Sequence, residues 1–285
     1  MGFTRARLFS HIILFKIRIW QALRTGPPYR SRMNRIIIDL THYCDLSCSN
    51  CNRSCGKDQA PSREVISADQ IRKFTEESIN RGIKWERIWL EGGEPALHPD
   101  LDEIFSILLR YKSDFFKNCE ITLCTNGNSD KAKEMYHSHP EGIIIKNSFK
   151  SAIPDQAHFP FNTAPSDIPE FANADFTWGC YIHKIFGLGL NRYGYYPHPV
   201  CGGIDRVFGF DIGKKKIPES AESMSGQMDK LCRYCGHFIE YHKGGKIDFK
   251  SIIFKNRYLP HNSISDIWVK AYSKYKKNKP SLKLY

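Results

Sequence analysis

The chain has 285 residues, a formal net charge of +12 and 41% hydrophobic residues, which is enough apolar material for a packed core and excludes a disordered protein. The charge is concentrated at the ends: residues 1–35 and the part after Asp266 hold 14 of the 42 Lys and Arg, which leaves 28 basic against 30 acidic residues between them. A basic groove across the core is therefore not indicated, and we expect no nucleic-acid partner.

Residues 1–35 form a basic, amphipathic N-terminal extension. Its apolar run from Leu14 to Trp20 is interrupted by Lys16 and Arg18 and is far shorter than the roughly 20 apolar residues of a membrane-spanning helix. We interpret it as a helix that packs on the body of the protein, with weak contact to a membrane surface as the alternative. Ten cysteines without a secretory signal pattern indicate a reducing, cytoplasmic location.

Strand-like and helix-like segments alternate between residues 35 and 150. The predicted strands are 35–40, 86–91, 120–124 and 142–145, and the predicted helices are 67–80, 99–111 and 131–137. This alternation is typical of an α/β protein with a parallel sheet, either open or rolled into a barrel.

The alternation stops after about residue 151. A proline-punctuated stretch is followed by glycine- and tyrosine-rich sequence from Trp178 to Gly213, and one closing helix is predicted over 263–276. We therefore divide the chain into the extension, an α/β domain over 36–175 and a smaller, loop-rich domain over 176–285.

Three cysteines lie close together just after the first predicted strand, at Cys44, Cys48 and Cys51. Three thiolates in one loop can bind three irons of a 4Fe–4S cluster and leave the fourth iron open. A structural zinc site completed by Cys55 is the main alternative, although the unequal spacing of three and then two residues is unusual for zinc. A disulfide scaffold is disfavoured by the expected compartment.

Three further unusual segments follow predicted strands directly. They are Gly92-Gly93-Glu94-Pro95, Thr125-Asn126-Gly127 and Asn147-Ser148. Because the carboxyl ends of parallel strands meet at one edge, and that edge is the active-site face of a parallel α/β barrel, we expect these segments and the cysteines to share one site.

The cysteine triplet together with the Gly-Gly-Glu-Pro segment resembles the radical S-adenosylmethionine (SAM) superfamily, over roughly residues 36–150. The resemblance implies a partial parallel (β/α)6 barrel, and a 4Fe–4S cluster whose open iron binds SAM. It also implies reductive cleavage of SAM to a 5′-deoxyadenosyl radical, with electrons from a flavodoxin- or ferredoxin-type donor. The implied SAM contacts are Gly92, Gly93, Glu94, Pro95, Thr125, Asn126 and Ser148. The family usually has an aromatic residue just before the third cysteine, where this chain has Asn50.

A second cysteine group lies in the C-terminal part, at Cys180, Cys201, Cys232 and Cys235. The last two are separated by two residues, a spacing that lets both thiolates reach one metal. The group resembles the auxiliary-cluster (Twitch or SPASM) extensions of radical SAM enzymes, which implies a second 4Fe–4S cluster. Structural zinc on the same thiols is the alternative, and His183 or His198 could replace one cysteine.

A second cluster would have a chemical role as an electron acceptor. A substrate radical formed from an alcohol must lose another electron and the hydroxyl proton to become a ketone, as in radical SAM dehydrogenases. We therefore predict oxidation of a hydroxylated small molecule or sugar moiety, with Lys150 as the leading candidate base. Weaker candidates are Asp155, His158, Asp205 and Arg206. The alternatives are a peptide-modifying radical SAM enzyme and, from another class, a zinc-stabilised nucleic-acid-binding protein.

Overall fold

The computed structural model describes residues 33–56, 59–148, 161–180, 182–219, 222–243, 246–247 and 264–285. Almost all of the N-terminal extension lies outside the described residues, so its predicted helix and membrane contact stay predictions. Within the described part of the chain, no helix is both long and apolar enough to cross a membrane.

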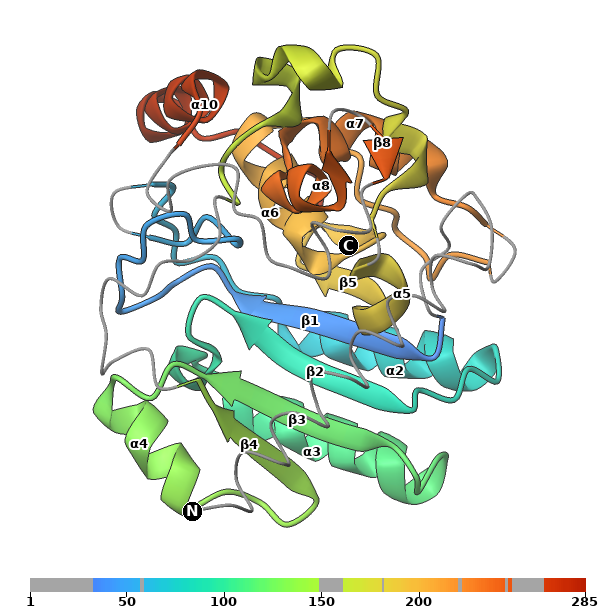
Figure 1. The fold of residues 1–285 in the computed structure, drawn as a ribbon. Coiled ribbons are helices and arrows are strands. Elements are labelled where there is room, and N and C mark those ends of the chain that lie inside the picture. Colours follow the sequence, from blue (N-terminus) through green and yellow to red (C-terminus); the bar gives the residue numbers. More distant parts are fainter. Residues whose placement is uncertain are drawn as a thin grey trace, which may run out of the picture.

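A six-stranded sheet forms the centre of the protein, with the strand order β4-β3-β2-β1-β5-β6 (Figure 1). Each neighbouring pair from β4 to β5 is parallel, and β6 is antiparallel to β5. The α/β class with a mainly parallel sheet is thus confirmed. The strands are β1 (Arg35–Thr41), β2 (Arg87–Gly92), β3 (Glu120–Thr125), β4 (Ile143–Asn147), β5 (Leu188–Asn191) and β6 (Gly194–Tyr196), and β7 (His242–Lys243) and β8 (Lys246–Ile247) form a separate hairpin.

Helices follow most of the strands. The α-helices are α2 (Ala68–Asn80), α3 (Leu101–Asp114), α4 (Asp130–His137), α5 (Ile182–Phe186), α6 (Pro199–Phe208), α7 (Ser225–Leu231), α8 (Gly236–Tyr241) and α10 (Asp266–Lys277). Short 3₁₀ turns include η1 (Pro95–Leu97), η5 (Phe176–Trp178) and η6 (Cys232–Tyr234). The start of α2 shows why these helices can be predicted from the sequence. Ser67 accepts a hydrogen bond from the backbone N–H of Gln70, whose side chain bonds back to Ser67, a capping box.

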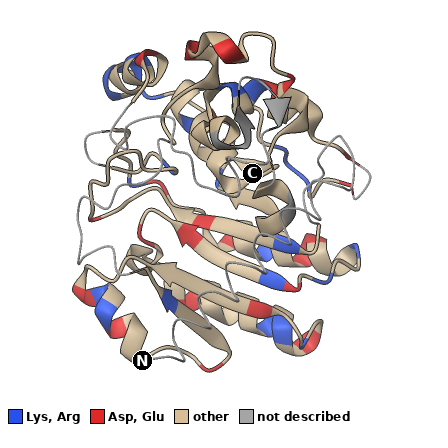
Figure 2. Ribbon diagram, viewed as in Figure 1, with Lys and Arg blue, Asp and Glu red and all other residues tan. Residues whose placement is uncertain are grey.

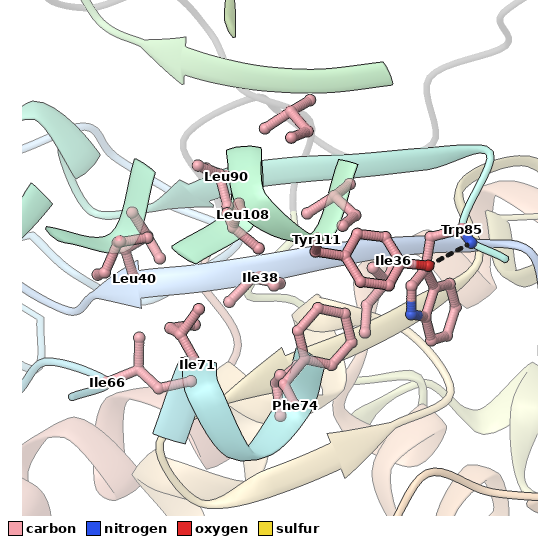
Figure 3. Close-up of a cluster of buried hydrophobic side chains, with 14 of the residues drawn as sticks. Ile36, Ile38, Leu40, Ile66, Ile71, Phe74, Trp85, Leu90, Leu108 and Tyr111 are labelled. Atoms are coloured by element: carbon pink, nitrogen blue, oxygen red, sulfur yellow. Dashed lines mark hydrogen bonds between the residues drawn. The ribbon is translucent and has the colours of Figure 1, made fainter. Parts of the chain in front are cut away.

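Helices α2 and α3 cover one face of the sheet and bury its alternate side chains (Figure 1). In the resulting core, Tyr111 of α3 accepts a hydrogen bond through Oη from the backbone N–H of Trp85 at 3.1 Å (Figure 3). Because strand side chains alternate between faces, the residues between these core positions point to the opposite, inner face. The core side chains shown include Ile36, Ile38, Leu40, Ile71, Phe74, Leu90 and Leu108.

The C-terminal part adds both sheet and helix to this core. Strand β5 comes from the segment predicted to be loop-rich, yet it pairs in parallel with β1. A Cβ at Gly189 of β5 would lie 2.3 Å from the backbone nitrogen of Pro199, so glycine is needed for α6 to pack this closely. Helices α6 and α10 share a second core built around Val200, Ile204, Trp268 and Tyr272.

Candidate active site

The loop after β1, residues 42–56, is here called the cysteine loop. It holds Cys44, Cys48 and Cys51, each partly exposed. Burial, and to a smaller extent the neighbouring Cys51, raise the pKa of the Cys44 thiol to about 12. Such a thiol must lose its proton before it can bind a metal, and a bound cation favours that loss.

Asn50, which stands where the family usually has an aromatic residue, shapes the cysteine loop. Its φ of 55° lies in the left-handed region, which Asn tolerates better than an aromatic residue does. Its buried side chain accepts a hydrogen bond from the backbone N–H of Asn162 at 3.2 Å. The position therefore serves loop geometry and a tertiary contact.

The Gly-Gly-Glu-Pro segment packs directly against the start of the cysteine loop. Gly93 donates a backbone hydrogen bond to Thr41 O at 2.7 Å, and Glu94 donates one to Tyr43 O at 2.8 Å. A Cβ at Gly93 would lie only 2.0 Å from Tyr43 O, and one at Gly92 only 2.3 Å from Thr41 O. The two glycines thus allow a contact between the ends of β1 and β2 that no other residue permits.

The Glu94 carboxylate connects the end of β2 to the end of β3. One oxygen accepts hydrogen bonds from Thr125 Oγ1 at 2.7 Å and from the backbone N–H of Ala96 at 3.1 Å. The other accepts from the backbone N–H of Asn126 at 2.7 Å. Burial raises the pKa of Glu94, and these donors oppose that shift. Since its oxygens are engaged within the protein, Glu94 positions the neighbouring strand ends.

The end of β3 in turn contacts the cysteine loop. Asn126 Nδ2 lies 3.7 Å from Cys44 Sγ and donates to Asp45 Oδ1 at 2.8 Å, while Asn128 Nδ2 donates to Asp45 Oδ2 at 2.7 Å. Ser148, beyond β4, donates its hydroxyl hydrogen bond to Thr125 O at 2.9 Å. The structure therefore brings together all four strand-end segments that the sequence placed at one edge.

The inner face of the sheet carries a row of polar side chains below this edge: Asp39, Glu91, Cys124 and Lys146. Arg53 of the cysteine loop donates to Asp39 Oδ1 at 2.9 Å and to Glu91 Oε2 at 2.7 Å. Burial raises the pKa of Asp39 to about 6, although Arg53 opposes the shift. Asp39 Oδ2 is buried and accepts no hydrogen bond from the described residues, so it is an acceptor available on this face.

The four cysteines of the second group lie near one another in the C-terminal part. Cys180 follows η5, Cys201 lies in α6, and Cys232 and Cys235 lie at the two ends of η6; all four are buried. A hydrogen bond with Cys201, followed by burial and the other thiols, raises the pKa of Cys232 well above its usual value. Burial, Cys180 and Cys201 do the same for Cys235. Among the described residues, no three Cys, His, Asp or Glu side chains converge closely enough to bind one metal ion.

Three histidines lie beside this second group; His183 and His198 are buried and His237 is partly buried. The ring centroid of His198 is 6.1 Å from that of His183 and 6.3 Å from that of His237. Burial lowers the pKa of His183 to about 4, and burial together with the charge of Arg53 lowers that of His237 to about 3. Burial and the charge of Arg53 also lower the pKa of His198, so all three rings are neutral, and Arg53 of the cysteine loop lies close enough to His198 and His237 to influence both.

The candidate bases fall into two sets. Lys150, Asp155 and His158 lie outside the described residues, so their roles stay predictions. Asp205 and Arg206 are buried in α6 in structural contacts: Asp205 accepts from Tyr196 Oη at 2.6 Å, and Arg206 Nη2 donates to Ser54 O at 2.7 Å.

Sequence reasoning missed the contribution of Asp39, Glu91, Arg53 and His237. A signal was present for two of them, because Asp39 and Glu91 interrupt apolar strands at positions that face away from the helices. No comparable signal marks Arg53 or His237, whose importance arises from tertiary contacts.

Comparison with known proteins agrees with this geometry. Residues 38–144 match the family model described as the radical SAM superfamily. A GTP 3′,8-cyclase of Campylobacter jejuni subsp. doylei is 30% identical over 96 residues, which cover 34% of this chain and 28% of the relative. A probable GTP 3′,8-cyclase of Methanococcus maripaludis is 32% identical over 99 residues, which cover 35% of this chain and 30% of the relative. The matches thus span less than a third of these relatives' length.

Among solved structures, BtrN in complex with AdoMet and 2-DOIA matches with a TM-score of 0.41 and 13% identity, covering 72% of this chain and 89% of that chain. The family match begins within β1 and ends within β4, so it contains the cysteine loop, the Gly-Gly-Glu-Pro segment and the end of β3. Residues 38–144 therefore form a domain of the radical SAM superfamily.

Proposed function

We propose that the chain is a radical SAM oxidoreductase with two 4Fe–4S clusters. Cys44, Cys48 and Cys51 hold the first cluster, and the four cysteines of the second group hold the other. When bound, the first cluster supplies the electron that cleaves SAM to methionine and a 5′-deoxyadenosyl radical. The protein binds and orients the reactants and excludes water from them.

The close-packed strand ends support the proposed SAM site. Gly92 and Gly93 present backbone groups beside the cysteine loop without a side chain in the way. Glu94 holds Thr125 and Asn126 at the same edge. In this proposal Pro95, Asn126 and Ser148 complete the pocket for the methionine and ribose portions of SAM.

The closeness of four buried thiols from separate segments, which lie near Cys232 without converging on one metal-binding point, is the observation that carries the oxidoreductase proposal. Cys180 and Cys235 are 55 positions apart in the sequence, yet Cys180, Cys201 and Cys235 all lie close enough to Cys232 to raise the pKa of its thiol. Oxidation of an alcohol by hydrogen abstraction needs an acceptor for a second electron. A cluster on these cysteines would supply that acceptor, whereas structural zinc, which has no redox chemistry, would not.

The inner face of the sheet supports a hydroxylated substrate. Asp39 Oδ2 is buried and accepts no hydrogen bond from the part of the chain that the structure describes, and Lys146 adds a cation to the same row. A substrate hydroxyl group can donate a hydrogen bond to the Asp39 carboxylate and accept one from the Lys146 ammonium group. In this proposal Lys150, two residues beyond Ser148, takes the hydroxyl proton.

The similarity to GTP 3′,8-cyclases favours a reaction like theirs over alcohol oxidation, but it is the weaker argument. It covers about a third of this chain, at most 35%. It therefore supports a shared SAM-binding domain and leaves the substrate to be decided by the rest of the molecule.

Anaerobic reconstitution, followed by iron and zinc counts and an assay of 5′-deoxyadenosine release, tests the proposal. We expect about eight irons per chain, the content of two 4Fe–4S clusters. Cys48→Ala should remove about four irons and reduce 5′-deoxyadenosine to background. Cys232→Ser with Cys235→Ser should also lower the iron content but leave SAM cleavage measurable. Cys119→Ala is the matched control, because it removes a thiol buried in the core behind the sheet. It should keep the full iron content and the full rate of SAM cleavage.

Two outcomes would contradict the proposal. Background-level SAM cleavage by the reconstituted parent protein would reject the radical SAM activity. About four irons with one zinc would retain that activity but remove the internal electron acceptor, and alcohol oxidation would then be the wrong reaction class.

A further inference from the structure

A surface hollow of about 330 Å³ separates the cysteine loop from helix α10. Ser47, Cys48 and Ser49 line one side, and Tyr272, Ser273 and Lys276 line the other. Cys48 is the middle cysteine of the triplet. One wall of this hollow is therefore a proposed ligand of the first cluster.

Helix α10 presents positive charge beside this hollow. Lys270, Lys274, Lys276 and Lys277 are exposed, and none forms an ion pair with another described residue. Asp266, at the start, is the helix's only acidic residue. Figure 2 shows the basic residues of α10 on the outside of the molecule, and Figure 1 shows the helix next to the cysteine loop. Lys276 lines the hollow that reaches Cys48, and the other three lysines extend the positive charge along the exposed side of α10.

The inner side of α10 is fixed firmly in place. Its Tyr272 and Tyr275 belong to the second core, and Tyr272 Oη donates to Ser54 Oγ of the cysteine loop at 3.0 Å. The helix that carries the lysines is therefore held in place next to the cysteine loop. A surface used for repeated docking near a redox centre needs this property, because a mobile tail would not define the distance for electron transfer.

We propose that this hollow and the lysine-bearing side of α10 next to it form the docking surface for an acidic one-electron carrier protein of the flavodoxin or ferredoxin type. The inference rests on the proposed function, because each SAM cleavage consumes one electron. The reduced carrier loses one electron to the first cluster. That electron passes to SAM, whose carbon–sulfur bond to the deoxyadenosyl group breaks to give methionine and the 5′-deoxyadenosyl radical. Opposite charge on the two surfaces speeds encounter and fixes the docked orientation.

A charge-reversal variant tests the docking surface directly. Lys274→Glu, Lys276→Glu and Lys277→Glu are combined in one protein. The matched control reverses Lys84, Lys117 and Lys216, three exposed lysines outside α10 that form no ion pair with the described residues. Both variants change the net charge by the same amount, so a general charge effect appears in both.

Two measurements are made on each reconstituted protein. The first is the dissociation constant for a flavodoxin at several ionic strengths. The second is 5′-deoxyadenosine release, driven either by reduced flavodoxin or by dithionite, a small reductant that needs no docking surface. For the α10 variant we expect binding weakened about tenfold or more, a smaller dependence on salt and slow release with flavodoxin. Release with dithionite should stay unchanged.

The outcomes separate this inference from the proposed function. If the parent releases no 5′-deoxyadenosine with dithionite, the proposed function is wrong. If dithionite works but the α10 variant binds flavodoxin as tightly as the control variant does, the docking surface is wrong. The docking surface is also wrong if the α10 variant keeps its flavodoxin affinity and instead loses binding to anionic lipid vesicles.

Discussion

Arg206 in α6 donates a hydrogen bond from Nη2 to the backbone carbonyl of Ser54 in the cysteine loop, at 2.7 Å. Its Nη1 donates to Ala60 O at 3.1 Å and to Tyr275 Oη of α10 at 2.6 Å. The side chain is fully buried. The C-terminal part of the protein thus holds the loop that carries the first three cysteines.

We predict that Arg206→Met destabilises the protein by about 2–4 kcal/mol, because it leaves the buried carbonyls of Ser54 and Ala60 without donors. Denaturant unfolding measures the change, and limited proteolysis should show faster cleavage within the cysteine loop. Arg233→Met, at a partly exposed arginine paired with Asp229, should change stability by less than about 0.5 kcal/mol. Equal stabilities of the two variants would show that Arg206 does not hold the loop.

Gly93→Ala is expected to destabilise the junction of β1 and β2 by about 3 kcal/mol. Its Cβ would lie 2.0 Å from Tyr43 O, so the backbone must move and the hydrogen bond to Thr41 O is strained. Iron content after reconstitution should fall as well. Gly226→Ala in α7 is the control, because a Cβ there meets nothing within 4 Å; it should be neutral or stabilising by up to about 1 kcal/mol. Similar behaviour of the two variants would contradict the close-packing argument.

Glu94→Gln should destabilise the protein by about 2 kcal/mol and weaken SAM binding. The carboxylate accepts three hydrogen bonds, and an amide NH₂ in place of one oxygen would face a donor. Equilibrium unfolding and a SAM titration measure the two effects. Glu134→Gln, at an exposed position of α4, provides the control. Unchanged SAM affinity in Glu94→Gln would show that the link between β2 and β3 does not support the pocket.

His98 should make stability depend on pH. Its Nε2–H donates to Ile66 O at 2.8 Å, and its Nδ1 accepts from the backbone N–H of Asp100 at 3.0 Å, so the folded protein holds the neutral ring. Burial lowers its pKa below the usual 6.5. Below about pH 6.5 the unfolded chain therefore binds more protons at this site than the folded protein does, and lowering the pH favours unfolding.

The His98→Gln variant isolates this effect. Its unfolding free energy should fall less than that of the parent between pH 7.5 and pH 5, so the stability difference between the two narrows at low pH. A difference that is the same at both pH values would show that His98 does not titrate in this way.

Much of the first part of the fold could be predicted from sequence because its signals are local. The strands over 35–40, 86–91, 120–124 and 142–145 are confirmed within two residues of their predicted bounds, and the helices within three. These signals are the alternation of apolar and polar residues, the capping residue Ser67 and the glycine-rich strand ends. Each of them depends on only a few neighbouring residues. The convergence of the strand-end segments followed from the parallel sheet alone.

The C-terminal part was harder to predict for a physical reason. Strand β5 is four residues long, and Gly189 within it is a poor strand former that serves the close approach of α6. Helix α6 contains Gly202 and Gly203, which local propensity disfavours but which let it pack against Asn191 and the cysteine loop. These two elements are selected by tertiary packing, so no local pattern marked them, whereas the closing helix predicted over 263–276 is confirmed as α10 within three residues.

The contact between Arg206 and the cysteine loop is made to main-chain oxygens. Every residue has a backbone carbonyl group, so this contact needs an arginine in α6 but needs no particular side chain in the loop. Substitutions that keep the path of the backbone would leave the contact intact. The loop's side chains could therefore be changed, for example to tune the surroundings of an iron centre, while position 206 could not.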